Sequence, residues 1–380
     1  MAQRDDTTGT GAEPARDAEQ VTVYYDAGRF AAWPFNHGLW RFPDGDLLVA
    51  FSRGATAYDS PAEVGHRTVD AERGEYVTLR STDGGRTWPL ESLRVLGTHA
   101  GLEAALRAAG APAAPETPPD WTSPDFCLTA GFGIPPHSAQ HLGYTQYSRD
   151  RGRTWEGPFA VPAFGFDWVQ VKPDFLVRPD GLVLLFVTVR RRANGGAGGA
   201  GSRFVAVYAT PDGGLTWRYL SAILATSPDE PYVNRYYASP VLLPDGRILV
   251  ALRCQIDARN AWPEVFESAD GGRTWRFVAR VADWGGPTHL SSLPDGRLLA
   301  VYGYRTPAYG VRARLSEDAG RTWGRELILR DDGGSYDLGY PRAVPLGDGR
   351  VLAAYYFNRR DDPVQQNGGV RHIAATIFAP

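Results

Sequence analysis

Arginine, tyrosine and histidine side chains recur beside the ends of apolar segments throughout this 380-residue chain. Arginine is suited to bidentate recognition of carboxylates, because its planar guanidinium presents paired donors. A phenol with an ordinary pKa near ~10 is a poor nucleophile unless cations or a base lower the cost of removing its proton. The candidates of this kind are His37, Arg53, Lys172, Arg235, Tyr237, Arg253, His289, Arg305, Arg312, Tyr340 and Arg342. Such a set is suited to an anionic or polar ligand if the fold brings its members together.

A repeated eight-residue motif indicates which fold that is. The form S/T-x-D-x-G-x-T-W occurs five times, with its Asp at positions 83, 150, 212, 270 and 318. A short Asp side chain can accept backbone N–H bonds across a tight turn, Gly permits positive φ, and the closing Trp can pack beneath a sheet. We therefore interpret these motifs as structural supports of hairpins rather than as ligand sites.

A second pattern lies between the motifs and consists of an apolar strand, a D-G turn and another apolar strand. Its turns contain Asp44, Asp180, Asp245, Asp295 and Asp348. Together the two patterns define six units, which predicts an all-β fold: a six-bladed β-propeller of four-stranded antiparallel blades. The second unit has no D-G turn, its first strand is obscure, and a helix-prone insertion near residues 100–119 precedes it. The sixth unit lacks the eight-residue motif.

The sixth unit also lacks an outer strand, which the apolar residues 21–25 are able to supply. We expect this strand to close the ring, so that residues 21–380 form one domain and residues 1–20 a disordered tail. Deleting residues 1–26 should then destabilise the protein, whereas deleting residues 1–17 should not.

Composition narrows the functional classes. The formal charge of -3 argues against a nucleic-acid partner, and the lack of an 18-residue apolar run argues against a membrane partner. The N-terminus has no apolar signal core, so we expect a cytoplasmic protein. His137 and His141 have no third ligand in view, so we expect no metal site, and the Gly-rich residues 195–201 lack a P-loop context. No cofactor is expected, and the oligomeric state is left open.

The repeated motifs and the unit pattern resemble the sialidase superfamily over about residues 21–380, and a divergent bacterial branch of it more than an ordinary sialidase. The resemblance implies an exo-glycosidase for a terminal, anionic sugar, with a tyrosine nucleophile, a glutamate partner, an aspartate acid/base and three arginines that grip a carboxylate. By position, Tyr340 matches the nucleophile and Arg253 the second arginine. Asp70 matches the acid/base, with Asp59 in reserve. Arg312 is nearest to the third arginine, and Arg305 is next.

The chain departs from the family pattern at two positions. No arginine stands in residues 33–37, where the family has its first one, and Arg235, Arg342 or Lys172 are the possible replacements. The position of the family's glutamate falls on Ala238, which leaves Tyr237 or Glu264 to stand near the tyrosine.

Other interpretations of these residues remain open. The arginines can pair with carboxylates of the blades, Tyr340 can be an axial packing residue, and His37 and His289 can be structural. The functional alternatives are a non-catalytic carbohydrate-binding propeller, a polysaccharide lyase acting on a uronate, and a protein-interaction scaffold.

Overall fold

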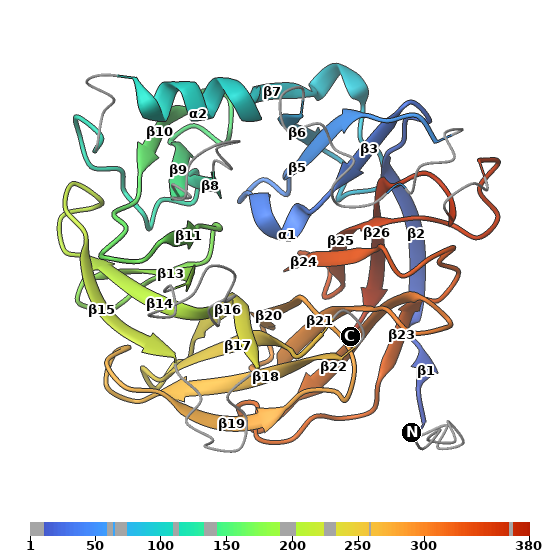
Figure 1. Ribbon diagram of the computed structural model, residues 1–380. Coiled ribbons are helices and arrows are strands. Elements are labelled where there is room, and N and C mark those ends of the chain that lie inside the picture. The colour runs from blue at the N-terminus through green and yellow to red at the C-terminus, as the bar shows by residue number, and fades with distance from the viewer. Residues whose placement is uncertain are drawn as a thin grey trace.

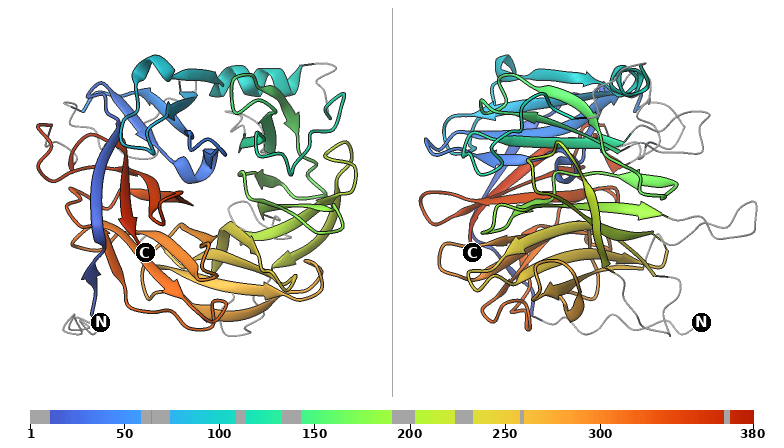
Figure 2. Two further views of the ribbon diagram at one scale, coloured as in Figure 1. Left: turned by 180° about the vertical axis from the view of Figure 1, so that it is seen from behind. Right: turned by 90° about the vertical axis from the view of Figure 1, so that its left-hand side faces the viewer.

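The computed structural model describes residues 11–58, 64, 74–108, 114–132, 143–190, 203–223, 233–257, 260–364 and 368–380. Six β-sheets surround a central axis, one for each repeat unit (Figure 1). Figure 2 shows the same ring from behind and edge-on. The predicted six-bladed propeller is confirmed. No helix in the described ranges is both long and apolar enough to span a bilayer.

The first three blades contain the strands between residues 29 and 223. Blade one consists of β3 (Arg29–Ala32), β4 (Leu39–Arg41), β5 (Leu47–Ala55), β6 (Glu75–Ser81) and β7 (Arg94–Thr98). Blade two consists of β8 (Cys127–Phe132), β9 (Gly143–Ser148) and β10 (Glu156–Ala160). Blade three consists of β11 (Trp168–Gln170), β12 (Phe175–Val177), β13 (Val183–Arg190), β14 (Arg203–Thr210) and β15 (Arg218–Ile223).

The last three blades are more regular. Blade four consists of β16 (Asn234–Leu242), β17 (Ile248–Gln255), β18 (Ala261–Ser268) and β19 (Arg276–Arg280). Blade five consists of β20 (Thr288–Ser292), β21 (Leu298–Tyr304), β22 (Gly310–Ser316) and β23 (Leu327–Arg330). Blade six consists of β24 (Gly339–Pro345), β25 (Val351–Phe357), β26 (His372–Ala379) and the N-terminal β2 (Arg16–Tyr24).

Short helices interrupt or join the strands. The one-turn helix α1 (Pro34–His37) separates β3 from β4, and α2 (His99–Arg107) lies in the insertion before blade two, where a helix was expected. A 3-10 turn, η1 (Leu90–Ser92), precedes β7. In blade two, the described residues form a three-stranded sheet, which agrees with the obscure first strand of this unit.

The N-terminal strand closes the ring as predicted. β2 pairs antiparallel with β26, with Val21 opposite Ala375, and lies along the outer edge of blade six (Figure 1). The boundary expected for the tail is wrong, however, because β2 begins at Arg16 and a further strand, β1 (Glu13–Pro14), pairs parallel with β23 of blade five. Ala15 between them is buried. The ordered chain therefore starts before residue 21, and deletion of residues 1–17 removes paired structure.

The eight-residue motifs form the expected turns at the ends of the third strands. In the last one, Thr322 donates its backbone N–H to Asp318 Oδ1 at 2.9 Å and its hydroxyl to Oδ2 at 2.6 Å. Ser316 Oγ donates to Asp318 and accepts from the Gly320 N–H at 2.8 Å. These bonds favour the ionised carboxylate and lower the pKa of Asp318 to about 2. All five motifs share the hydroxyl-to-carboxylate bonds.

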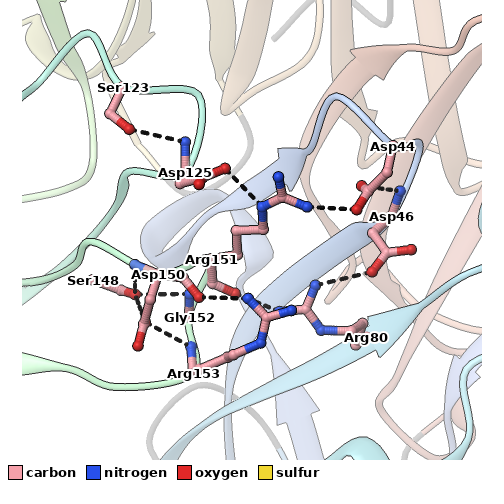
Figure 3. A network of polar contacts seen from close by, with 10 residues as sticks. All are labelled: Asp44, Asp46, Arg80, Ser123, Asp125, Ser148, Asp150, Arg151, Gly152 and Arg153. Carbon is pink, nitrogen blue, oxygen red and sulfur yellow. Dashed lines mark hydrogen bonds and ion pairs between the residues drawn. The ribbon is translucent and has the colours of Figure 1, made fainter.

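The motif of blade two also joins two blades (Figure 3). Arg151, at its fourth position, forms ion pairs with Asp125 and with Asp44 of the D-G turn in blade one. Arg80 of β6 pairs with Asp46 at 3.4 Å and donates to the Arg151 carbonyl. The face that carries the turns is therefore occupied by structural polar contacts, which leaves the opposite ends of the inner strands to be considered as a functional site.

Candidate functional site

In four blades the inner strand is broken or has a bulge. A polar or aromatic residue lies at each break or bulge. In blades one and three the inner strand is broken, since β3 and β4 both pair with β5, and β11 and β12 both pair with β13. The breaks hold α1 and residues 171–174. In blades four and six the register shifts between Tyr236 and Ser239 and between Gly339 and Arg342. Bulges of this kind re-aim side chains and are common beside active sites.

The two bulges turn Tyr237 and Tyr340 toward each other. Both residues have positive φ, 62° for Tyr237 and 53° for Tyr340, a conformation that costs a non-glycine residue about 1–2 kcal/mol. Tyr340 donates its hydroxyl hydrogen to the Tyr237 hydroxyl oxygen over 3.4 Å, and the rings meet edge to face at 5.5 Å. Burial, followed by the neighbouring Tyr340, raises the pKa of Tyr237 well above its usual value. The structure thus selects Tyr237 as the residue beside Tyr340.

Two arginines approach Tyr340. Arg253, near the end of β17, donates from Nη1 toward the Tyr340 hydroxyl over 3.5 Å. The Arg305 guanidinium lies over the Tyr340 ring at 5.3 Å and donates to the Leu338 carbonyl and to the Tyr356 hydroxyl. A guanidinium beside the phenol oxygen can stabilise the negative charge that a nucleophilic tyrosine develops as it attacks.

Arg342 connects opposite sides of the ring beneath the tyrosines. It leaves β24 of blade six and pairs with Asp174 of blade three at 2.6 Å, and both side chains are buried. It also donates two hydrogen bonds to the carbonyl of Phe35 in α1, at 3.1 and 2.9 Å. α1 lies inside the ring (Figure 1), and the Phe35 ring packs against Tyr237 and Tyr340 at 6.0 and 6.5 Å. Arg342 therefore positions Phe35, against which the rings of Tyr237 and Tyr340 pack.

Lys172 lies beside the tyrosine pair. Its Nζ is 3.7 Å from the centroid of the Tyr237 ring, and the residue is 2% exposed. In the described part of the chain, Nζ has no hydrogen-bond partner. Burial lowers the pKa of Lys172 well below its usual value; Asp174 opposes the shift, and Arg342, Arg203 and Arg253 add to it.

The two histidine candidates are held in neutral forms. His37 Nε2 lies 2.8 Å from Ser52 Oγ, and burial lowers the His37 pKa well below its usual value. His289 Nδ1 accepts from the Ala343 N–H at 3.2 Å, and burial with the charge of Arg342 lowers its pKa. Their contacts position β5 and β24.

Three arginine candidates are engaged in contacts with their own blades. Arg53 pairs with Glu75 at 2.8 Å, Arg235 with Glu264 at 3.5 Å, and Arg312 with Glu326 at 3.5 Å. Arg312 also donates to the carbonyl of Arg330 at 2.7 Å, toward the outer strand β23. Of the two residues nearest to the family's third arginine, Arg305 rather than Arg312 contacts Tyr340.

Some predicted residues cannot be placed. Asp70 and its reserve Asp59 lie outside the described residues, as do His137 and His141. Glu264 accepts a hydrogen bond from Trp262 Nε1 at 2.7 Å and contacts Cys254, within blade four. Phe35 was missed as a site residue; the Pro34 that starts a one-turn helix is the only local signal for it. Across the described ranges, no three His, Cys, Asp or Glu side chains are arranged to hold a metal ion.

A six-bladed ring with five such motifs, and a tyrosine between arginines at its inner strand ends, defines the class as a sialidase-like propeller, here a divergent one. A family model supports this: the chain belongs to the BNR repeat-like domain family, whose model matches residues 134–353.

Known proteins agree with that assignment. A sialidase from Micromonospora viridifaciens is 27% identical over 333 residues, which is 72% of this chain and 50% of that protein. The chain thus spans about half the length of this relative. A crystal structure of a protein of unknown function from Dyadobacter fermentans has a TM-score of 0.72 and 27% identity, covering 95% of this chain and 98% of that one. An α-L-arabinanase from Penicillium chrysogenum, solved with arabinobiose, shares the fold at a TM-score of 0.56 and 15% identity, covering 95% and 97%. The propeller is therefore of the type that glycoside hydrolases have.

Proposed function

We propose that the protein is an exo-glycosidase that hydrolyses a terminal, anionic sugar at the Tyr237–Tyr340 pair. The observation that carries the proposal is the environment of the Tyr340 hydroxyl, which donates to Tyr237 and receives a hydrogen bond from Arg253. Tyr237 relays the phenol proton to a base: it takes the proton of Tyr340 and gives up its own hydroxyl proton, which leaves a Tyr340 oxygen that Arg253 stabilises. This oxygen is then suited to attack an anomeric carbon.

The preference for an anionic sugar rests on the balance of charge around the pair. Arg253, Arg305 and Arg203 approach the rings of Tyr236 and Tyr340, whereas Asp174 is already bound to Arg342. Because guanidinium groups bind carboxylates in a bidentate manner, a sugar acid is the ligand that matches this excess of positive charge.

Departure of the leaving group requires an acid that protonates its oxygen. We assign this role to Asp70, which lies between β5 and β6 in the sequence. In the second half of the reaction, the same carboxylate removes a proton from water, which attacks the anomeric carbon and releases Tyr340. The sugar then keeps its anomeric configuration, since two displacements occur.

The test is an activity screen with purified protein at about micromolar concentration on sialosides, ulosonides, uronides and neutral glycosides. Hydrolysis of an acidic glycoside, lost in Tyr340→Phe and strongly reduced in Asp70→Asn, is the expected result. Tyr219→Phe is the matched control, because Tyr219 is 44% exposed on the outer strand β15. Saturable glycan binding without turnover, or an unsaturated product typical of a lyase, contradicts the proposal.

A further inference from the structure

Lys172 is chemically exceptional in this chain. Of the 40 lysine and arginine residues, it is the only lysine. Positions that need only a positive charge are occupied by arginine throughout, including every other cation around the tyrosine pair. Lys172 is the only position with a side-chain amine, so the chemical difference between an amine and a guanidinium can matter there. That difference is the ability to lose and regain a proton, which arginine lacks in proteins.

The geometry puts this amine against the reacting pair. Lys172 follows β11 at the break in the inner strand of blade three, and its Nζ lies over the Tyr237 ring at 3.7 Å. The nearest carboxylate in sequence, Asp174, gives its Oδ1 to Arg342 at 2.6 Å. Among the described residues this buried amine has no hydrogen-bond partner, and because buried polar groups in native proteins are nearly always satisfied, its lack of a partner calls for a functional explanation.

We propose that Lys172 accepts the proton that leaves the tyrosine pair when Tyr340 attacks. This inference rests on the proposed function and supplies the base for which the family's glutamate position has no carboxylate. The Tyr340 proton moves to the Tyr237 oxygen, along the direction in which Tyr340 already donates. The proton of Tyr237 moves to Lys172 Nζ, which turns from the face of the Tyr237 ring toward the hydroxyl to accept it. The bond from Tyr340 oxygen to the anomeric carbon forms, the glycosidic bond breaks, and the leaving oxygen takes its proton from the acid. Hydrolysis returns the proton by the reverse path.

The charged groups that face Lys172 are compatible with both its neutral amine and its protonated ammonium form. Arg203, Arg253 and Arg342 disfavour an ammonium before the reaction, and burial acts in the same direction. Once protonated, the ammonium lies over the face of the Tyr237 ring, where a cation is attracted, and Asp174 is the anion that favours it. Lys172 thus acts through Tyr237 and touches neither sugar nor leaving group.

The single lysine makes a direct test possible. Protein labelled with ε-¹⁵N-lysine gives one side-chain signal, whose shift reports the protonation state of Lys172 without any substrate. We expect this signal to titrate well below that of an ordinary lysine. A signal of an ammonium up to pH 9 overturns the inference.

Activity measurements on variants distinguish a role of the Lys172 amine from a role of its charge or of its packing. Lys172→Arg keeps a cation and Lys172→Met keeps the apolar length, and both should lower kcat about 100-fold or more with little change in KM. The acid limb of the wild-type kcat/KM profile should follow the lysine titration, and small alkylamines should restore activity to Lys172→Ala in proportion to their basicity. Near-normal kcat in Lys172→Arg, or no amine rescue in a folded Lys172→Ala, refutes the role of Lys172 while the active wild type still supports the proposed function. An inactive wild type removes the proposed function itself.

Discussion

The Arg342–Asp174 pair, which joins blade six to blade three across the axis, is the contact whose removal should most affect stability. In Arg342→Met, the buried Asp174 carboxylate loses its counter-ion, and the Phe35 carbonyl loses two donors. Removing one partner of a buried pair typically costs about 3–5 kcal/mol. An unfolding entropy of ~2.1 cal/mol/K per residue gives about 0.8 kcal/mol/K for this chain, so Tm should fall by about 4–6 °C.

The deficit should depend on pH in a defined direction. Burial raises the pKa of Asp174, whereas the charge and hydrogen bond of Arg342 lower it. Without Arg342 this pKa rises further. A carboxyl group whose folded pKa is raised contributes stability at low pH, and this stability is lost as pH rises from ~3.9, the unfolded value, through the folded pKa. The difference between Arg342→Met and the wild type should therefore be smaller at pH 5 than at pH 8.

Urea unfolding of both proteins at pH 5, 6, 7 and 8 measures this difference. Arg325→Met is the control, because Arg325 pairs with Glu13 at an exposed site and should cost less than about 1 kcal/mol. A loss in Arg342→Met no larger than that of the control, or an equal loss at all four pH values, refutes the reasoning that the axial pair is buried and coupled.

Three further predictions concern the ring itself. Ala319 has φ 58° at the motif position where Gly84 has φ 72°. Because positive φ strains a residue that has a Cβ, thermal unfolding should show that Ala319→Gly stabilises and Gly84→Ala destabilises the protein by about 0.5–1 kcal/mol. Shifts of the opposite sign contradict the strain argument. Deleting residues 1–17 removes β1, so it should lower Tm, and deleting residues 1–26 should lower it more; an unchanged Tm in the first deletion contradicts the pairing of β1 with β23. The pKa of Asp318 is about 2, so its ionised form stabilises the fold above pH ~4, and this contribution is lost as pH falls toward 2; Asp318→Asn should show a shallower acid-unfolding curve than the wild type, and identical curves refute the assignment.

The ring and its closure were predictable because their signals are local. The Asp and Gly of the repeated turns specify backbone conformations that few other residues allow, and the apolar residues near 21–25 had one missing outer strand to fill. The tail boundary was wrong because β1 and the start of β2 are exposed and polar, so their sequence has no strand pattern. Their pairing with β23 and β26 is a contact between the two ends of the chain, which no local signal encodes.

Only part of the site was predictable from the sequence. The rest depends on the register in which neighbouring strands pair. Tyr340 and Arg253 lie together as predicted, since both stand at the inner ends of strands. Arg312 donates to the carbonyl of Arg330 in β23, at a register shift of the β22–β23 pairing that falls between Val311 and Arg312 and that no local pattern predicts. The bulges at Tyr237 and Tyr340 depend on how strands pair, so the sequence did not distinguish Tyr237 from Glu264 as the neighbour of Tyr340.

The most direct test of the account is to trap the sugar on the protein. A fluorinated glycosyl fluoride of the best acidic substrate, which slows the second displacement, should leave one sugar on each chain. Peptide mapping by mass spectrometry should place it on the oxygen of Tyr340, with no label in Tyr340→Phe. Turnover of the substrate with the label on another residue, or with no covalent label under conditions that inactivate the protein, would contradict Tyr340 as the nucleophile.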